Sequence, residues 1–537
     1  MTAAGAGGSA APGGRVGAAG LGAIGLSLVA FLVTALLGPS AMEPALPGPA
    51  GRPPYSLAAH PSPYLVIGLV AVGVLAAAAG LGLCLYAMQR GWSCRARPLL
   101  TGALLVVAAF VIMPPVGSGD HLNYAVYGRM AVTGHDPYVT GARDLPGDPI
   151  AAVVERPWRE EPSIYGPIAT AQQAFASWVG GDSVRLTVFA LSLTNALAFV
   201  LVGLVLYRMA GRSEAGRLRS VLLWTGNPLL LFHLVSGAHN DVLAIAAAVG
   251  SLAVFSGGRR EADPEADPEA RTPRMRRILA AGGLIGAGAA IKLPAALAGG
   301  GPAWALLSAV PVAGRGDPPW WRSWPPWRPL RGRSARLIQL VGLVGAAAVV
   351  AVLAFAAAGA HAFDQVQRAS RSVSLATPWH LVDVALGRDA HRPIIQAGSL
   401  ILLVVLGLLL IRLLPPGEES HRVAAALVLA WLFAAPYALP WYDAFGWALL
   451  APLPWSAVDA LLLARTAVLS LAYLPARDPQ VVRLPDGLSW LFTVVRPTII
   501  PWALTGILAA LVALAVLRRP GRPAARPAPE PVSPPRA

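Results

Sequence analysis

The sequence predicts an all-α, polytopic integral membrane protein with about 12–14 transmembrane helices. Of its 537 residues, 55% are hydrophobic and only 13% are charged, about half the charged share of an average soluble domain. The mean hydropathy is +0.59. The apolar runs are long and continuous, which favours helical spans of about 20 residues over an outer-membrane barrel. The composition therefore excludes a soluble enzyme that carries a single anchor.

Fourteen apolar runs are interpreted as spans, and they form one membrane domain over residues 17–517. The first run follows Arg15 as a signal sequence would, but it is long and further spans follow, so we expect it to be retained. Residues 1–16, rich in Ala and Gly, and the tail 518–537, rich in Pro, Ala and Arg, are expected to be disordered. The predicted spans are 17–37, 63–88, 99–113, 184–207, 220–236, 241–257, 278–292, 293–312, 337–358, 396–414, 422–438, 443–463, 465–475 and 498–517.

The arginines predict the orientation of these spans. Lys292 is the one lysine in a chain with 42 basic residues. Arginine clusters follow the second, fourth, sixth, eighth and last predicted spans, so all of them fall on one side. The positive-inside rule makes that side, and both termini, cytoplasmic. The net charge of +15 is thereby explained without a nucleic-acid partner.

The largest loop on the opposite side, residues 114–183, is acidic and rich in aromatic residues. It contains eight acidic residues and four arginines, in a chain that is strongly basic overall. It also contains the aromatic residues Tyr124, Tyr127, Tyr138, Trp158 and Tyr165. We expect this segment to be the main extracytoplasmic, catalytic loop and to carry interfacial helices. No duplicated half, as many transporters have, is visible in the sequence.

Asp120 follows the third predicted span, in the motif Gly117-Ser118-Gly119-Asp120-His121. A carboxylate at the membrane surface can meet a lipid head group and act as a general base. The alternative is a helix cap, because Ser and Asp commonly start helices. The stretch 122–130 has the apolar period of an amphipathic helix that such a cap would begin.

Two turns in the same loop carry a tyrosine each. Gly and Pro in Gly134-His135-Asp136-Pro137-Tyr138 and in Tyr165-Gly166-Pro167 are typical of turns. Tyr138 is either a stacking surface for a sugar ring or the anchor of a rigid turn. Neither motif is specific alone.

Two further polar groups lie between or at the ends of spans. His239-Asn240-Asp241 begins the sixth predicted span and faces the same side as Asp120. A tight turn explains Asn and Asp there but does not require His239, nor His233 deeper in the span. Lys292 lies in apolar sequence before Pro294. It is either a snorkelling lysine or the partner of an anion such as a lipid phosphate.

Together these residues resemble the GT-C class of membrane glycosyltransferases, in particular the actinobacterial α-(1→6)-mannosyltransferases of lipomannan and lipoarabinomannan mannan-core synthesis. The resemblance covers mainly residues 100–300, and Asp136 stands where the family more usually has Asn. The order and spacing of the motifs carry it. The matching residues are Ser118, Asp120, Tyr124, Gly128, Gly134, Asp136-Pro137-Tyr138, Tyr165-Gly166-Pro167, Asn227-Pro228, His239-Asn240-Asp241, Lys292 and Pro294.

The resemblance implies transfer of mannose from polyprenyl-phosphate-mannose to a mannan or glycolipid acceptor. The transfer would take place on the outer face of the cell membrane and invert the anomeric carbon. It implies Asp120 as the catalytic base and no metal or other cofactor, while Arg368 could add positive charge near the donor. The substrate-binding residues would be Tyr124, Arg129, Tyr138, Tyr165, His239, Asn240, Asp241 and Lys292. The alternatives are a secondary transporter, a polyprenyl-lipid flippase, or a GT-C enzyme for another sugar such as arabinose or glucose.

Overall fold

The computed structural model describes residues 12–156, 158–260, 274–308, 328–364, 372–387 and 391–517. Within these residues every regular element is a helix, and the only β feature is an isolated bridge between Ser40 and Glu43. The all-α prediction is confirmed. The C-terminal tail, residues 518–537, lies outside the described residues.

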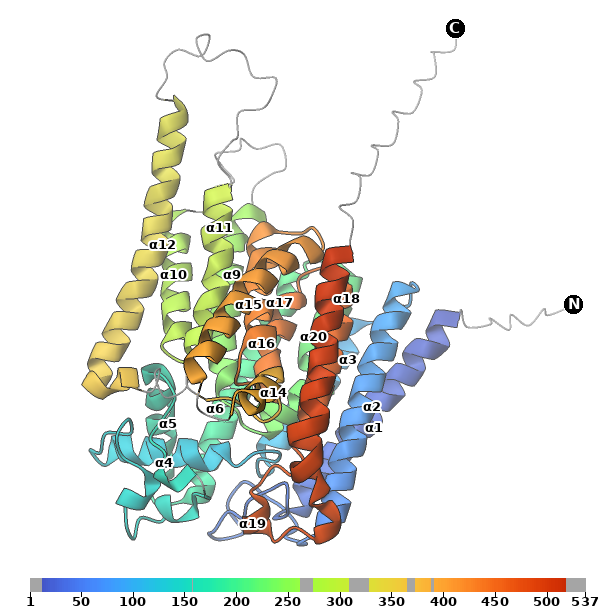
Figure 1. Cartoon of the computed structure of the whole chain (residues 1–537), viewed down its shortest axis with the longest axis vertical. Coiled ribbons are helices and arrows are strands. Elements are labelled where there is room, and N and C mark those ends of the chain that lie inside the picture. Colours follow the sequence, from blue (N-terminus) through green and yellow to red (C-terminus); the bar gives the residue numbers. More distant parts are fainter. Residues whose placement is uncertain are drawn as a thin grey trace, which may run out of the picture.

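Most of the helices run side by side in one bundle (Figure 1). The larger helices of the bundle are α1 (Pro12–Leu37), α2 (Pro63–Gln89), α3 (Ala96–Val111), α6 (Val184–Met209), α9 (Asp241–Arg260), α10 (Met275–Ala289), α11 (Gly300–Ser308), α12 (Arg328–Ala358), α15 (Arg392–Leu413), α16 (Glu419–Ala434), α18 (Ala457–Ala472) and α20 (Ile500–Leu517). The shorter elements of the bundle are α7 (Glu214–Ser220), η4 (Val221–Thr225), α8 (Pro228–Leu230), η5 (Leu231–Ser236), η7 (Leu293–Gly299), η10 (Pro440–Asp443), α17 (Ala444–Leu450) and η12 (Leu491–Ile499).

Seven helical segments of the described chain are long and apolar enough to cross a membrane. They are α1, α2, α6, the run from α7 to η5, α12, α15 and the run from η11 (Asp486–Leu488) to α20. Two shorter apolar helices, α3 and most of α9, accompany them. A helix of 20 residues is about 30 Å long, which matches the hydrocarbon layer. The chain is therefore a multi-span membrane protein.

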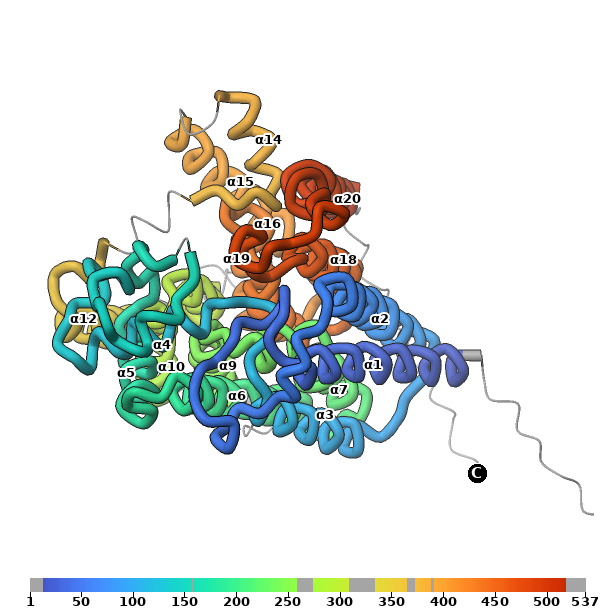
Figure 2. Tube along the Cα trace, turned by 90° about the horizontal axis from the view of Figure 1, so that it is seen from below, coloured from blue at the N-terminus to red at the C-terminus, as the bar shows by residue number. Residues whose placement is uncertain are grey.

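The two ends of the bundle differ. The first and last described residues, Pro12 and Leu517, lie at the upper end in Figure 1. The lower end carries α4 (Asp120–Val132), α5 (Pro167–Gly180) and α19 (Pro479–Val482), and the 114–183 segment wraps beneath the bundle there (Figures 1 and 2). The remaining short helices are η1 (Ala142–Asp144), η2 (Ala151–Val153), η3 (Trp158–Glu160), η9 (Ala360–Phe363) and α14 (Pro378–Ala385).

The prediction that residues 1–16 are disordered is wrong for residues 12–16. Helix α1 already begins at Pro12. Its first turns pack on the loop after α2, where a Cβ on Gly17 would lie 2.3 Å from the indole of Trp92. Composition suggested a flexible segment, but this close approach of Trp92 to a glycine gives the helix a packing surface.

The boundary between the predicted spans 443–463 and 465–475 is also wrong. The structure has the short helix α17, then a break, then α18, which runs continuously through residue 464. The break contains Pro452 and Pro454, and the side chains of Ser456 and Asp459 form a capping box that starts α18. Prolines and the capping box outweigh hydropathy here, because hydropathy does not record backbone hydrogen bonding.

Helix α4 confirms the predicted helix after Asp120 but differs in its burial. An amphipathic helix should have one polar, solvated face, whereas nine of the 13 residues of α4, on all sides of the helix, are buried. Helices α5 and α6 pack against it. A Cβ on Gly128 would lie 2.1 Å from the carbonyl oxygen of Gln173 in α5, so α4 and α5 approach closely only because residue 128 is glycine.

Candidate active site

Asp120 is the first residue of α4, and its side chain does not cap the helix. The N-cap is Gly119, without a side-chain cap bond, and the backbone N–H of Asp120 donates to Ser118 Oγ at 3.0 Å. The Asp120 carboxylate instead meets Tyr124 Oη, which donates to it at 3.5 Å. Nδ1 of His239 lies 3.6 Å from the same Oδ2 oxygen. The helix-cap alternative therefore does not account for this side chain.

The surroundings of Asp120 favour a group that can accept a proton near neutral pH. Burial raises the pKa of Asp120 to about 6, the hydrogen bond from Ser118 lowers it, the charge of Asp241 raises it, and Lys292 and Tyr124 lower it. Burial also lowers the pKa of His239 well below its usual value. The imidazole is therefore neutral at pH 7, and it supplies no full positive charge to the carboxylate.

Two tyrosines connect Asp120 to a second segment of the loop. Tyr165 Oη donates to Tyr124 Oη at 3.2 Å, and Tyr124 Oη lies 3.2 Å from Nδ1 of His239. The two tyrosine rings meet edge to face, with centroids 5.0 Å apart. The turn that holds Tyr165 docks on the end of α10, because Gly166 N–H donates to the carbonyl of Ile291 at 3.1 Å. A Cβ on Gly166 would lie 2.2 Å from the carbonyl oxygen of Ala290.

Lys292 is the next residue after Ile291, and its side chain extends toward Asp241 and Tyr442. Its ammonium pairs with Oδ1 of Asp241, and Nζ lies 3.4 Å from the ring centroid of Tyr442. Only 16% of its side chain is exposed. A snorkelling lysine would extend toward water, so this placement contradicts that alternative.

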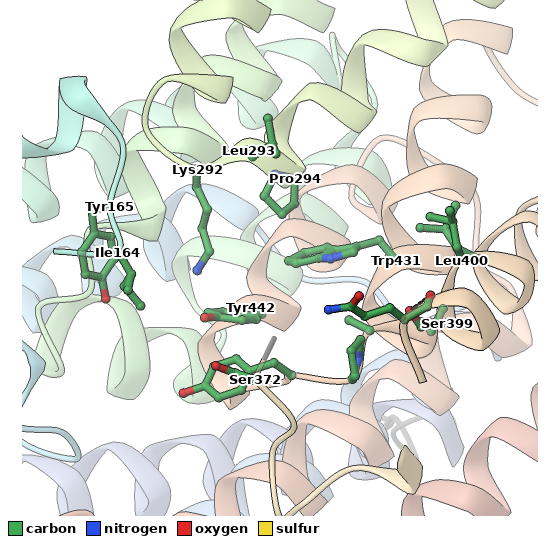
Figure 3. A pocket seen from close by; sticks show the side chains of 16 residues that line it. Ile164, Tyr165, Lys292, Leu293, Pro294, Ser372, Ser399, Leu400, Trp431 and Tyr442 are labelled. Atoms are coloured by element: carbon green, nitrogen blue, oxygen red, sulfur yellow. Dashed lines mark hydrogen bonds between the residues drawn. The ribbon is translucent and has the colours of Figure 1, made fainter. Parts of the chain in front are cut away.

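A cavity of about 490 Å³ lies beside Lys292. Figure 3 shows the lysine extending between Tyr165 on one side and Tyr442 and Trp431 on the other. Polar groups and apolar walls are combined in this cavity. Its polar or aromatic lining residues are Tyr165, Lys292, Ser372, Gln396, Ser399, Trp431, Tyr437 and Tyr442, and its apolar ones include Ile164, Leu293, Pro294, Leu400 and Leu403.

One wall of the site, residues 431–442, was not identified from the sequence. The indole of Trp441 stacks on the imidazole of His239, with centroids 3.6 Å apart and planes inclined by 17°. Tyr442 lies beneath Lys292 and stacks with Trp431 at 5.9 Å. The available signal was Pro436 and Pro440 around an aromatic pair. The predicted spans 422–438 and 443–463 placed Pro436 at the end of one span and left residues 439–442 in the loop between them.

Six of the nine predicted site residues lie near one another, and the other three do not join them. Asp120, Tyr124, Tyr165 and His239 are linked by the contacts above. Asp241 and Lys292 form an ion pair close to them, and Tyr165 and Lys292 line the cavity. Arg129 pairs with Asp148 and Asp182 at 2.7 and 2.6 Å. Tyr138 is buried, and its hydroxyl lies 2.9 Å from Thr170 Oγ1, so its position matches the turn-anchor alternative. Asn240 is buried in the turn before α9, and Arg368 lies outside the described residues.

A metal would need ligands that this group does not assemble. Among the described residues, no three His, Cys, Asp or Glu side chains are grouped so that they could hold a metal ion. Asp120 and Asp241 both lie near the ammonium of Lys292, so the group already contains a cation. Independence from metal stays a prediction.

These features define the class: a multi-span, all-helical membrane protein in which a largely buried carboxylate lies near a lysine from a distant segment, and that lysine lines an aromatic cavity. Residues 20–308 match the model of a known family, described as alpha-(1->6)-mannopyranosyltransferase, N-terminal domain. The chain belongs to this α-(1→6)-mannopyranosyltransferase family, which confirms the family that the motifs predicted.

Individual relatives share parts of the chain. Alpha-(1->6)-mannopyranosyltransferase A of Corynebacterium glutamicum is 30% identical over 142 residues, which is 26% of this chain and 28% of that protein. A probable alpha-(1->6)-mannopyranosyltransferase of Mycolicibacterium smegmatis is 31% identical over 222 residues, 38% of each chain. The matched stretches thus span less than two fifths of these relatives. The crystal structure of ArnT from Cupriavidus metallidurans bound to undecaprenyl phosphate aligns over 78% of this chain and 76% of its own, with a TM-score of 0.36 and 16% identity.

Proposed function

We propose that the protein transfers a mannosyl residue from polyprenyl-phosphate-mannose to a mannan or glycolipid acceptor and forms an α-(1→6) linkage. Membership of the family supports this activity. The structural observation that carries the proposal is that Asp120 and Lys292 lie near enough for their charges to interact. The carboxylate of Asp120 is linked through Tyr124 to Tyr165, whose turn docks beside Lys292. Lys292 lines the cavity.

In the proposed reaction, Asp120 is the general base. A hydroxyl oxygen of the acceptor attacks C1 of the mannosyl group, its proton passes to Asp120, and the bond between C1 and the phosphate oxygen breaks. The phosphate leaves with the bonding electrons as part of the polyprenyl phosphate. A base and a leaving group on opposite faces of the sugar invert C1. Removal of the proton as the new bond forms is the contribution expected of a positioned carboxylate.

Lys292 is the proposed partner of the leaving phosphate. A cation near the bridging oxygen stabilises the charge that develops as the C1–O bond breaks. Asp241 holds the ammonium in the absence of donor, and the face of Tyr442 stabilises it through a cation–π contact. The phosphate and Asp241 would both contact the ammonium of Lys292. This one cation would balance the charge of a monoanionic or dianionic lipid phosphate without a dedicated metal ion.

The apolar side of the cavity suits the lipid part of such a donor. Leu400 lines the cavity and is 65% exposed on α15. Its neighbours Ile401 and Val404 are 66% and 56% exposed, as expected of a helix surface that faces lipid tails. A polyprenyl chain could therefore extend from the cavity along α15 into the bilayer while its phosphate stays near Lys292.

We propose that the site faces the outside of the cell membrane and that both termini are cytoplasmic. The arginine-rich loops support this orientation through the positive-inside rule. In the structure the described chain ends lie at the end of the bundle opposite α4 and α5 (Figure 1). The donor would be made on the cytoplasmic side and used on the outer side.

The test is a transfer assay with the purified full-length protein in detergent or vesicles. The donors are polyprenyl-phosphate-mannose, its glucose counterpart and its arabinose counterpart, with short α-mannosides as acceptors. Mannose transfer with an α-(1→6) linkage in the product is expected. Preferential use of glucose or arabinose would assign another sugar, and movement of labelled lipid between leaflets without any transfer would favour the flippase alternative.

A further inference from the structure

Helix α18 presents a buried polar face to the aromatic wall of the candidate site. Thr466 and Ser470, one turn apart on this helix, are 0% and 3% exposed. Residues four apart lie on the same helix face. This face contacts two residues of other segments that the proposed reaction does not use, Asp443 and His233.

Asp443 is the last residue of η10, directly after the two aromatic residues of the site. Its carboxylate pairs with the guanidinium of Arg465, and Thr466 Oγ1 donates to it at 2.8 Å. Trp447, one turn further along the chain, donates its indole N–H to the same Thr466 oxygen at 3.1 Å. Asp443 is 0% exposed, and a buried carboxylate is retained only with such partners.

His233 approaches Trp441 from another direction. Its Nε2 lies 2.8 Å from Ser470 Oγ. Ser470 Oγ also lies 2.7 Å from the carbonyl oxygen of Thr466, so the hydroxyl links His233 to the backbone of α18. The imidazole centroid of His233 lies 6.2 Å from the indole of Trp441.

Trp441 and Tyr442 transmit this arrangement to the reacting groups. Trp441 stacks on His239, which contacts the Asp120 carboxylate. Tyr442 lies beneath the ammonium of Lys292. A displacement of η10 by even 1 Å would alter both contacts, and misplacement on that scale can cost about 100-fold in rate.

We infer that Asp443 and His233 are positioning residues, held by Thr466 and Ser470, that fix Trp441 against His239 and Tyr442 beneath Lys292. The inference rests on the proposed function where it concerns rate. Where it concerns the placement of η10, it depends only on the contacts above. Arg465, paired with Asp443 and donating to the carbonyl of Leu432, completes the support.

The chain offers a matched control in the same helix. Asp459, in the first turn of α18, pairs with Arg219, which also donates to the carbonyls of Leu450 and Leu453. This second buried arginine–aspartate pair holds the segment before α18. These bonds of Asp459 and Arg219 involve no residue of η10 and no residue that lines the cavity. Asp459→Asn should therefore weaken the helix start without moving Trp441 or Tyr442.

The experiment combines hydrogen exchange of the substrate-free protein with transfer kinetics. Thr466→Val keeps the side-chain shape but removes the hydroxyl, and Thr466→Ser restores it. We expect Thr466→Val to speed amide exchange over residues 441–447 by about 10–100-fold, the effect of losing a hydrogen bond to a charged group. We expect wild-type exchange in Thr466→Ser. Ser470→Ala, which removes the partner of His233, should have a smaller effect in the same segment.

Thr466→Val should also lower the transfer rate by about 10–100-fold and raise KM for the lipid donor. The acid limb of its pH profile should move to lower pH, because a displaced Trp441 admits water to Asp120 and removes part of the burial that raises its pKa. Asp459→Asn should speed exchange at residues 450–456 only and leave the acid limb in place.

The inference would be overturned by wild-type exchange at 441–447 in Thr466→Val. An equal shift of the acid limb in Thr466→Val and Asp459→Asn would overturn it as well, since that pattern belongs to general destabilisation. Exchange is measured without substrate. A wild-type protein that transfers no sugar would therefore contradict the proposed function while the exchange data still decide the role of η10.

Discussion

The Asp120 carboxylate lies 3.6 Å from Nδ1 of His239. The indole of Trp441 covers one face of the same imidazole ring, with the ring centroids 3.6 Å apart. Because burial keeps His239 neutral, Asp120 has hydrogen-bonding neighbours but, among the described residues, no cation that forms an ion pair with it. A carboxylate in such a setting is costly to ionise and correspondingly basic. This relationship leads to the following predictions.

Asp120→Asn should abolish nearly all sugar transfer. Asn keeps the size of the side chain and can cap a helix about as well as Asp, but it cannot take the proton of the acceptor. Loss of a general base typically costs about 10²–10⁴ in rate. The measurement is the single-turnover rate with bound lipid donor. Asp136→Asn, in the same loop, is the control and should stay active; near-normal transfer by Asp120→Asn would instead make Asp241 or Asp136 the candidate base.

The rate of transfer should fall in acid with a midpoint set by Asp120. Its pKa is raised to about 6, mainly by burial, and the base works only when ionised. The rate should therefore be half-maximal near pH 6 and decrease about tenfold per pH unit below it. The check is kcat/KM from pH 5 to pH 8. A flat profile down to pH 4.5 would mean that a carboxylate with an ordinary pKa is the base.

Asp120→Asn should stabilise the folded protein at neutral pH. Asp120 has a pKa of about 6 in the folded protein, against 3.8 for an unperturbed aspartate. The raised pKa adds to the free energy of unfolding at pH values below the pKa of the unfolded chain, and this contribution is lost as the pH rises through 6. At pH 7 the ionised carboxylate therefore costs the folded protein about 3 kcal/mol. Asn carries no such cost. Thermal unfolding should show a higher midpoint for Asp120→Asn than for wild type at pH 7.5, and a smaller difference at pH 5; an unchanged midpoint at both would argue against a buried, raised carboxyl.

Lys292→Ala should weaken use of the lipid donor more than use of the acceptor. The ammonium pairs with Asp241 and lies over Tyr442, at the wall of the cavity. Lys292→Arg should restore donor use only in part, because a larger, planar guanidinium does not replace a compact ammonium in the tight site between Asp241 and Tyr442. Initial rates with donor and acceptor varied separately provide the measurement. Asp241→Asn is the companion variant, and unchanged donor KM in all three would remove the phosphate-binding role.

Cysteine labelling of intact cells should distinguish the two ends of the bundle. In a background without Cys94, a cysteine at Ala152, exposed in the 114–183 segment, should react with an impermeant maleimide. A cysteine at Arg212, exposed beside α7, should react only after the membrane is opened. The reverse pattern would place Asp120 on the cytoplasmic side and contradict the proposed use of an outer-face donor.

Much of the architecture could be predicted from the sequence, because burial in a bilayer demands long apolar runs whose backbone bonds close within each helix. The predicted spans correspond to helices along most of the chain. Asp120, Tyr124, Tyr165, His239, Asp241 and Lys292 were recognisable because polar groups at span ends stand out against apolar sequence. Their order in the chain was also sufficient to predict the family.

The tertiary structure alone decided which of these groups meet. Nothing in the local sequence separates Tyr165, which reaches the cavity, from Tyr138, which bonds to Thr170. Trp441 and Tyr442 form a wall of the site only because α18 holds η10 against His239 and Lys292. Hydropathy reports how apolar a segment is, whereas convergence depends on the packing of segments hundreds of residues apart, and no periodicity within one segment encodes that.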